Sequence, residues 1–316
     1  MIGVLEGFAV IFTVIFVGYL LARLNIIASD EQRLTLNRIA FFAATPALVF
    51  QVVSTAPTDS FFSTVSLVSI VTALASAALF LALAYAYTRY KNTSQVDGAT
   101  LTMGAAASGY VNSNNIGLPV GIYVLGSTAY VPPLLLVQML IFTPIILALI
   151  TRNNQNTRVW QQLLHSLKNS LLSPVVLAAF SGLVVSICSL HVPELVLEPL
   201  SILGGASIPV ILLSFGASLH KASVLAPESL RALTILATTI KVLLMPVLAL
   251  CFGSLFHLHS DQLYAVVILA ALPTAQNVYN YAATYQRGQT ITRDTILLST
   301  FLSLPVMFCI ALLFGR

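Results

Sequence analysis

The chain has 316 residues, of which 58% are hydrophobic and only 8% are charged, and its mean hydropathy is +0.95. A soluble domain carries about 25% charged residues, so the composition excludes a soluble globular protein and predicts an integral membrane protein. The formal net charge of +4 does not indicate nucleic acid binding, because the basic residues fall in short loops between apolar segments.

Ten apolar segments are long enough to cross a bilayer as helices. In chain order they cover residues 4–22, 34–55, 61–88, 98–126, 130–151, 167–190, 195–219, 229–256, 262–286 and 291–314. No basic leader or small-residue cleavage site precedes the first segment, so it is predicted to be a membrane helix and not a removable signal. Polar residues and prolines interrupt the fourth and ninth segments.

Motifs that carry catalysis or bind cofactors are absent from the sequence, including the nucleophile elbow, the His-Glu-x-x-His pair and the phosphate-binding loop. Cys188, Cys251 and Cys309 lie in apolar segments without the spacing of metal ligands, and we expect them to be small buried hydrophobic residues. The sequence therefore predicts no enzyme, no cofactor and no metal site, and active transport would have to be secondary.

The basic residues predict the orientation of the chain. With the N-terminus outside, twelve of the fourteen lysines and arginines fall in inward loops or at their edges. The charged residues of the outward loops are all acidic. Positive charge is retained on the cytoplasmic side of membranes, so this asymmetry predicts ten spans with both termini outside. We expect a multi-pass protein of the inner or plasma membrane.

The two halves of the chain share landmarks at a nearly constant spacing of 161 to 164 residues. The pairs are Gly18 with Gly182, Pro46 with Pro209, Asn115 with Asn277, and Pro144 with Pro305. Five helices per repeat is an odd number, so the second copy enters the membrane from the opposite side. The sequence predicts a first repeat over residues 1–151, a cytoplasmic linker over 152–166 and a second, inverted repeat over 167–316.

The interruptions of the fourth and ninth segments are the predicted ligand site. Amides, glycine and proline at bilayer depth are costly unless the backbone lines a protected cavity, and broken helices build such sites in secondary transporters. A half-helix N-terminus after each break would favour an anion, most simply a carboxylate. The alternative is a kinked helix whose amides only satisfy each other. The candidate residues are Asn112, Asn114, Asn115, Gly117, Pro119, Pro273, Thr274, Gln276 and Asn277.

Lys241 is the clearest charge inside a predicted span, about ten residues beyond Arg231. A cation at that depth needs a partner, which could be a carbonyl end of a broken helix, water or the bound anion. Alternatively, Lys241 extends to the cytoplasmic face. Asp97, Glu6 and Asp261 lie near segment ends, and we expect no carboxylate at the depth of Lys241, so coupling to protons or sodium stays open.

Weaker candidates lie in the second segment. Thr45 and Pro46 could line the same pocket, although packing is the more common role of such residues. Tyr110, Tyr279 and Tyr281 flank the breaks, where they could line a pocket or anchor the chain at the membrane interface.

With these residues the chain resembles the auxin efflux carrier family over its whole length. The resemblance rests on Asn115-Ile116-Gly117-Leu118-Pro119, on Lys241 followed by Met245-Pro246, and on residues 272–277, Leu-Pro-Thr-Ala-Gln-Asn. It implies ten helices as two inverted fives, in an arrangement like that of NhaA and the bile-acid symporters, with the fourth and ninth crossing at their prolines. It also implies a scaffold and a transport domain, elevator-like alternating access and a homodimer. Bacterial relatives are labelled malonate or malate permeases, and plant members, which export auxin, have a long cytoplasmic loop that this chain lacks.

Two functions follow from these observations. The first is a secondary carrier of a small organic anion, with the lipid bilayer as its environment and proton or sodium coupling open. The second is a membrane sensor that binds a ligand in the same pocket without transporting it. Flux across a liposome membrane separates them.

Overall fold

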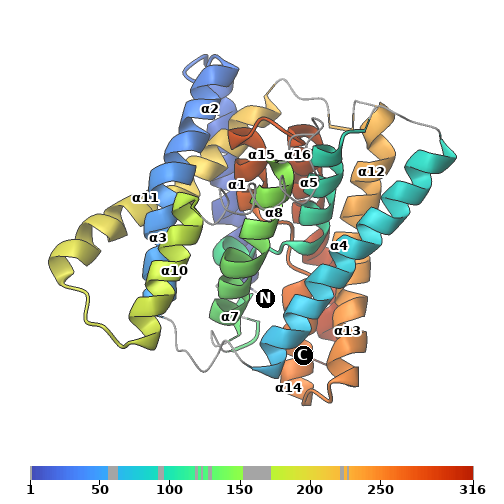
Figure 1. Cartoon of the computed structure of the whole chain (residues 1–316). Helices are drawn as coiled ribbons and strands as arrows, with labels where there is room; N and C mark the ends of the chain where they lie inside the picture. The colour runs from blue at the N-terminus through green and yellow to red at the C-terminus, as the bar shows by residue number, and fades with distance from the viewer. Residues whose placement is uncertain are drawn as a thin grey trace, which may run out of the picture.

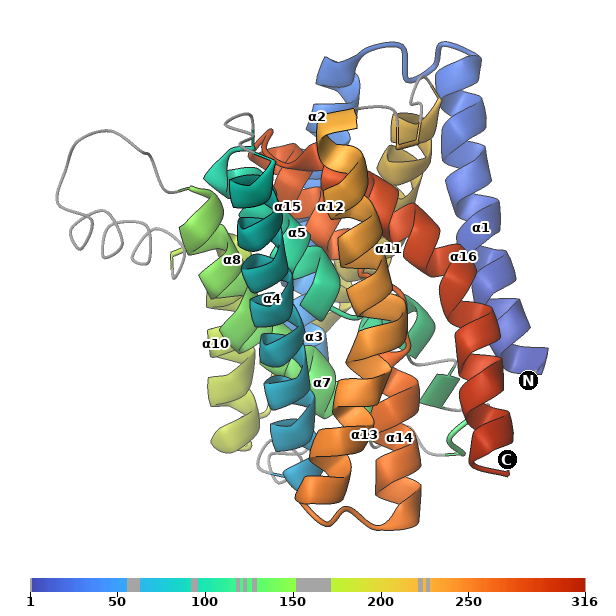
Figure 2. The same cartoon turned by 90° about the vertical axis from the view of Figure 1, so that its right-hand side faces the viewer.

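The chain folds into packed helices that run mostly along one axis, which is vertical in Figures 1 and 2. The computed structural model describes residues 2–55, 63–91, 96–117, 120–121, 124–126, 130–151, 172–220, 224–225 and 228–315. Its helices are α1 (Ile2–Arg23), α2 (Asp30–Ile39), α3 (Thr45–Ser54), α4 (Thr64–Tyr90), α5 (Gly98–Gly109), α7 (Val131–Val137), α8 (Thr143–Ile150), α10 (Pro174–Ile187), α11 (Glu194–Leu219), α12 (Glu228–Thr239), α13 (Met245–Leu255), α14 (Ser260–Ala270), α15 (Gln276–Thr284) and α16 (Gln289–Leu313).

Five of these helical stretches are long and apolar enough to cross a membrane. They cover Asp30–Ser54, Thr64–Tyr90, Glu194–Leu219, Glu228–Leu255 and Gln289–Leu313, and shorter apolar helices accompany them. The predicted apolar helices are therefore confirmed and are consistent with a membrane protein, whereas the count of ten spans stays a prediction. The predicted linker, 152–166, lies outside the described residues.

Three helical stretches, 30–54, 131–150 and 228–255, each contain one wide turn of π-helix, which the sequence analysis did not predict. These turns are η1 (Ala40–Ala44), η4 (Gln138–Phe142) and η5 (Ile240–Leu244). Each is followed by a helix with proline at its second residue, which is Pro46, Pro144 or Pro246. Proline offers no N–H to the carbonyl one turn back and its ring collides with that carbonyl, so the preceding turn widens and the helix continues.

Two helix pairs pack closely through glycines at matching positions of the two halves. Helix α1 packs on α11, where a Cβ on Gly18 would overlap the carbonyl oxygen of Leu213. Helix α10 packs on α3, where a Cβ on Gly182 would lie 3.0 Å from the carbonyl oxygen of Phe50. Small residues at such contacts let helix backbones approach each other in a membrane.

Gly216 on α11 provides a test of this packing. A Cβ there would overlap the carbonyl oxygen of Ile15 on α1, whereas a Cβ on Gly205 of the same helix would meet nothing within 4 Å. We expect Gly216→Ala to lower the free energy of unfolding by about 1–3 kcal/mol, because backbone atoms must move apart. Gly205→Ala, the matched control, should leave the thermal unfolding midpoint in detergent unchanged or slightly raised. Equal midpoints for the two variants would contradict the close contact.

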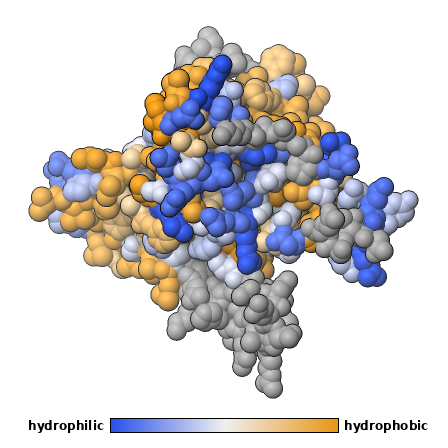
Figure 3. Space-filling view, turned by 90° about the horizontal axis from the view of Figure 1, so that it is seen from above, coloured by the Kyte–Doolittle hydropathy of each residue, from blue (hydrophilic) through white to orange (hydrophobic). Residues whose placement is uncertain are grey.

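The outer faces of the helices are apolar, and this corrects one expectation. Cys188, Cys251 and Cys309 are exposed and not buried. In a membrane protein apolar side chains can face lipid as well as the core, so hydrophobic surroundings in the sequence do not predict burial. One end of the molecule differs, because hydrophilic residues gather over its centre and hydrophobic residues flank them (Figure 3).

Candidate functional site

Helices α5 and α14 both stop in the interior of the protein, at the positions of the two predicted breaks. Helix α5 enters from the end of the molecule where α2 begins, and α14 enters from the opposite end (Figures 1 and 2). Helix α5 ends at Gly109 and α14 ends at Ala270, and each is followed by residues without helical structure. The interruptions predicted from proline, glycine and amides are thus present in the backbone.

The two interruptions pair with each other through main-chain hydrogen bonds. Val111 and Thr274 form an isolated antiparallel bridge. Asn112 N–H donates to the carbonyl of Pro273 at 2.8 Å, and Ala275 N–H donates to the carbonyl of Tyr110 at 3.2 Å. We call residues 110–112 and 273–275 the bridge region. Backbone groups freed by the breaks therefore satisfy each other in the core, where water could not.

Each helix end at the bridge region has a side chain that caps one of its last carbonyls. Thr274 Oγ1 donates to the carbonyl of Ala107 in α5 at 2.6 Å. Lys241 Nζ donates to the carbonyl of Ala270 in α14 at 2.7 Å and contacts Met245 Sδ at 3.0 Å. Ala107 and Ala270 are 163 positions apart, within the spacing of the predicted repeat. One of these two carbonyls accepts from a hydroxyl group and the other from the side-chain nitrogen of a lysine.

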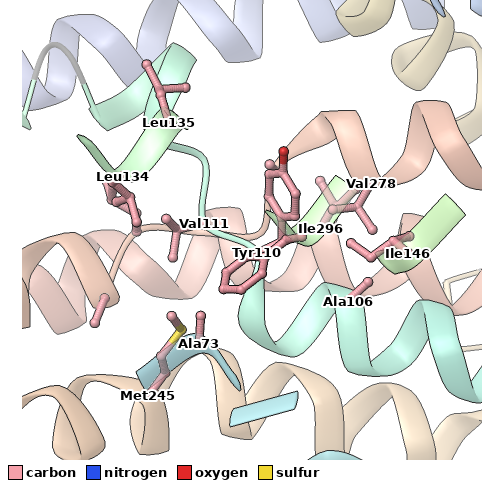
Figure 4. Close-up of a cluster of buried hydrophobic side chains, with 14 of the residues drawn as sticks. Ala73, Ala106, Tyr110, Val111, Leu134, Leu135, Ile146, Met245, Val278 and Ile296 are labelled. Atoms are coloured by element: carbon pink, nitrogen blue, oxygen red, sulfur yellow. The ribbon is translucent and has the colours of Figure 1, made fainter. Parts of the chain in front are cut away.

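Lys241 is completely buried, at 0% exposure, so it does not extend to the cytoplasmic face. Its ammonium group sits at the C-terminal end of α14, where the helix dipole carries partial negative charge. Met245 and Ala270, its two contacts, border one small cavity together with Val111 of the bridge region. Figure 4 shows Met245 near Val111 among buried side chains of several helices. The side-chain nitrogen of Lys241 therefore lies beside the bridge region.

Amide side chains from both halves meet at the same place. Asn112 Nδ2 donates to Gln276 Oε1 at 2.7 Å, and both side chains are buried. Gln276 is the first residue of α15, so the helix begins at the bridge region. One turn further along α15, the buried Asn280 has no hydrogen-bond partner for its side-chain nitrogen or oxygen among the described residues. A buried amide without partners is costly, so Asn280 is a polar group available to a ligand.

Side chains of other helices support the bridge region, and the sequence analysis missed them. Gln138 Nε2 donates to the carbonyl of Val111 at 3.0 Å, and Gln138 Oε1 accepts from Ser113 Oγ at 2.7 Å. Ser299 Oγ accepts from Thr274 N–H at 3.1 Å. Ser299 lies in an apolar helix, where a small hydroxyl residue gives no local signal. Gln138 could have been found from the sequence, because an amide inside an apolar span is unusual.

Three buried hydroxyl groups form a chain beside these contacts. Thr143 Oγ1 lies 3.2 Å from the hydroxyl of Tyr110 and 3.2 Å from the hydroxyl of Tyr281. Tyr110, Tyr279 and Tyr281 are all buried, which excludes a role as anchors at the membrane interface. Tyr110 and Tyr281 instead link the two broken stretches through Thr143 of α8.

The remaining predicted site residues are distributed as follows. Gly117 lies against Leu272, because a Cβ on it would sit 3.4 Å from a methyl group of that residue. Asn277 is partly exposed. Thr45 shares a 2.9 Å hydrogen bond with Ser207 between α3 and α11, and Pro46 follows it in α3, away from the bridge contacts. Pro119 and the side chains of Asn114 and Asn115 lie outside the described residues.

Asp294 is a buried carboxylate that the sequence analysis did not single out, and its place in the first turns of α16 leaves the expectation for the depth of Lys241 a prediction. It is 1% exposed in α16, where it binds Arg293 at 2.7 Å and accepts from Leu225 N–H at 3.0 Å. Asp294 lies in the first turns of its helix, beside a basic residue. In the sequence this pattern is typical of exposed charged residues where a loop meets a helix.

Thr274 permits a test of the bridge region that leaves its shape intact. Thr274→Val removes the hydroxyl that caps Ala107 and keeps the branched side chain. We expect a loss of about 1–3 kcal/mol of stability, because a buried carbonyl loses its partner. Thr102→Val is the control, since Thr102 is partly exposed and its hydroxyl donates to the carbonyl of Gly98 in its own helix. A thermal unfolding midpoint that falls equally in both variants would contradict the cap.

The site thus combines features suited to an anion. A buried ammonium group, hydroxyl groups, amides and the N-terminus of α15 surround two breaks that meet in the core. Such donors replace the water that hydrates a carboxylate, and a helix N-terminus adds partial positive charge. No acidic side chain takes part in the bridge contacts among the described residues.

Comparisons with known proteins identify the family of the chain. The model of a family described as "Membrane transport protein" matches residues 4–311. A protein of Rhizobium meliloti (strain 1021) named "Putative malonate transporter" is 28% identical over 312 residues, which cover 94% of this chain and 91% of that protein. The rice (Oryza sativa subsp. japonica) protein "Probable auxin efflux carrier component 9" is 27% identical over 154 residues, which cover 48% of this chain and 36% of that protein. The family resemblance of the sequence is confirmed: the chain belongs to the membrane transport protein family.

Proposed function

We propose that this protein is a secondary transporter of a small organic anion, most simply a carboxylate, and that the anion binds at the bridge region. The observation that carries the proposal is the buried ammonium group of Lys241 on the end of α14. A buried cation is costly, and a carboxylate that binds beside it would repay that cost. The name of the Rhizobium relative supports a carboxylate of the malonate class.

The proposed architecture is two inverted repeats of five helices, 1–151 and 167–316. The glycine contacts support it, since Gly18 against Leu213 and Gly182 against Phe50 are the same contact with the halves exchanged. The hydrogen bond between Thr45 and Ser207 joins positions 162 residues apart, and the bridge joins Val111 and Thr274, 163 apart. Contacts between equivalent positions are expected along a pseudo-two-fold axis.

The proposed mechanism is alternating access by an elevator-like movement. Helices α1, α2–α3, α10 and α11 would form a scaffold, and the broken stretches with their neighbours would move against it. The glycine contacts join scaffold helices to each other, and the bridge contacts join the broken stretches to each other. Each unit can then stay intact while the surface between them slides. A homodimer and external termini complete the proposal.

The test is flux in proteoliposomes. Purified protein should take up radiolabelled malonate, malate or indole-acetate faster than liposomes that lack it. Repeating the assay with imposed proton and sodium gradients identifies the coupling ion. Binding of one of these anions without flux would favour the sensor, and absence of both binding and flux for all of them would overturn the carboxylate proposal.

A further inference from the structure

A second polar cavity lies at the end of the molecule where α1 ends and α2 begins. Its volume is about 360 Å³, in the range of small-molecule sites, and it is separate from the bridge region. Hydrophilic residues gather at this end in Figure 3. The described residues that line it are Ala22, Ile27, Ala28, Ser29, Asp30, Arg33, Ala217, Ser218, His220 and Arg293.

Two arginines from different parts of the proposed machinery line this cavity. Arg33 belongs to α2 of the proposed scaffold, and its side chain is 21% exposed. Arg293 belongs to α16, which packs on α5 and α15 of the broken stretches and so belongs to the proposed moving unit, and its side chain is 16% exposed. A guanidinium group matches a carboxylate with two parallel hydrogen bonds, so two of them favour a carboxylate over a neutral ligand.

The carboxylates beside these arginines differ in how firmly they are held. Asp294 is 1% exposed and lies 2.7 Å from Arg293, so this pair is a fixed part of the wall. Asp30 is 90% exposed and lies 3.1 Å from Arg33. An exposed ion pair is worth little, so an incoming anion can replace Asp30 at Arg33 without a large loss.

Other polar groups complete the lining. Ser29 Oγ accepts from Gln32 N–H, which leaves its hydroxyl hydrogen to donate. Nδ1 of His220 is buried and has no hydrogen-bond partner among the described residues, while its ring packs edge-on against Tyr19. The cavity therefore holds two guanidinium groups, of which only Arg293 has a buried carboxylate partner, and a buried polar atom that the contacts of the described residues do not satisfy.

We propose that this cavity is a second anion site, which takes a small organic carboxylate from the solution at this end before it reaches the bridge region. The inference rests on the proposed function and adds a separate entry site to it. Arg33 would bind the carboxylate in place of the exposed Asp30, while Asp294 keeps Arg293 paired in the wall. Because its two arginines come from two units, the site would also change shape when those units move.

Thiol labelling at the cavity tests the inference without requiring transport. Ala28 is exposed and lines the cavity, so Ala28→Cys places a thiol there in a background with Cys188, Cys251 and Cys309 replaced by alanine. In phosphatidylcholine nanodiscs, an anionic methanethiosulfonate should react about tenfold faster than a neutral one of similar size, because Arg33 can exchange the exposed Asp30 for the reagent. Malonate should slow the reaction in a saturable way.

Variants of Arg33 identify the source of the effect. Arg33→Gln should remove most of the preference for the anionic reagent and the protection by malonate, and Arg33→Lys should restore the preference. Arg38→Gln is the matched control, since Arg38 is exposed on the same helix but does not line the cavity.

Three results would overturn the inference: no preference for the anionic reagent, no protection by malonate, malate or acetate, or equal effects of Arg33→Gln and Arg38→Gln. Protection by added phosphatidylglycerol in place of these acids would assign the cavity to lipid headgroups and also overturn it. Failure of the proposed transport function would be detected by a different measurement, the absence of flux in proteoliposomes that contain the wild-type protein.

Discussion

Replacing Asn112 with aspartate is expected to lower anion transport by about 100-fold or more while the protein still folds and inserts. Asn112 is buried and bonded to Gln276 at 2.7 Å, and an aspartate keeps its size. The new carboxylate would face the bound anion. Two like charges about 4 Å apart repel by about 4 kcal/mol at the effective dielectric of a protein, which is ample for a 100-fold loss. The measurement is initial uptake in proteoliposomes at pH 7.

Two further variants separate charge from shape. Gln276→Glu places the same charge on the partner side chain and should have a similar effect. Asn25→Asp changes an exposed residue of the turn between α1 and α2 and should transport normally. If Asn112→Asp retained more than half of the wild-type uptake of malonate, the bridge region would not be the anion site.

Replacing Lys241 with methionine is expected to weaken carboxylate binding about tenfold or more, which corresponds to about 1.4 kcal/mol. Methionine has a similar length and no charge, so the packing around residue 241 is kept. The carbonyl of Ala270 loses its donor, which costs about 1–3 kcal/mol. Removing a buried charge from the apolar interior offsets that loss, so the stability of the ligand-free protein should change little. Binding is measured by titration of purified protein, and stability by thermal unfolding.

The matched control is Lys91→Met, which alters an exposed lysine at the end of α4. It should bind like the wild type. A large loss of thermal stability in Lys241→Met without a change in affinity would show that Lys241 only caps α14. A loss of affinity without a loss of stability would support its role as the counter-charge of the anion.

The sequence allowed the prediction of features that depend on residue type alone. Apolar length predicted the helices, and the prolines, glycine and amides near residues 112–119 and 273–277 predicted where two of them stop. For Lys241, a carbonyl end of a broken helix was one of three partners considered, and it is the one observed. These predictions succeeded because a proline or a charge at bilayer depth restricts the backbone wherever the rest of the chain lies.

Features that depend on contacts between distant segments could not be predicted in the same way. Gln138 and Ser299 support the bridge region from helices 25 residues or more away in the chain. The π-turns before Pro46, Pro144 and Pro246 could not be predicted from proline alone. Two other prolines, Pro209 and Pro305, lie within α-helices that contain no π-turn. Whether a proline widens a turn depends on the packing around it, which one sequence does not reveal.

The hydrogen bonds that join the two breaks run between main-chain atoms, from Asn112 to Pro273 and from Ala275 to Tyr110. Such bonds do not depend on the identity of the side chains at those positions. Substitutions can therefore accumulate around the bridge region while its backbone geometry is retained. Specificity for a new acid could then be acquired, in evolution or in the laboratory, by exchanging side chains such as Asn280 without a redesign of the helix breaks.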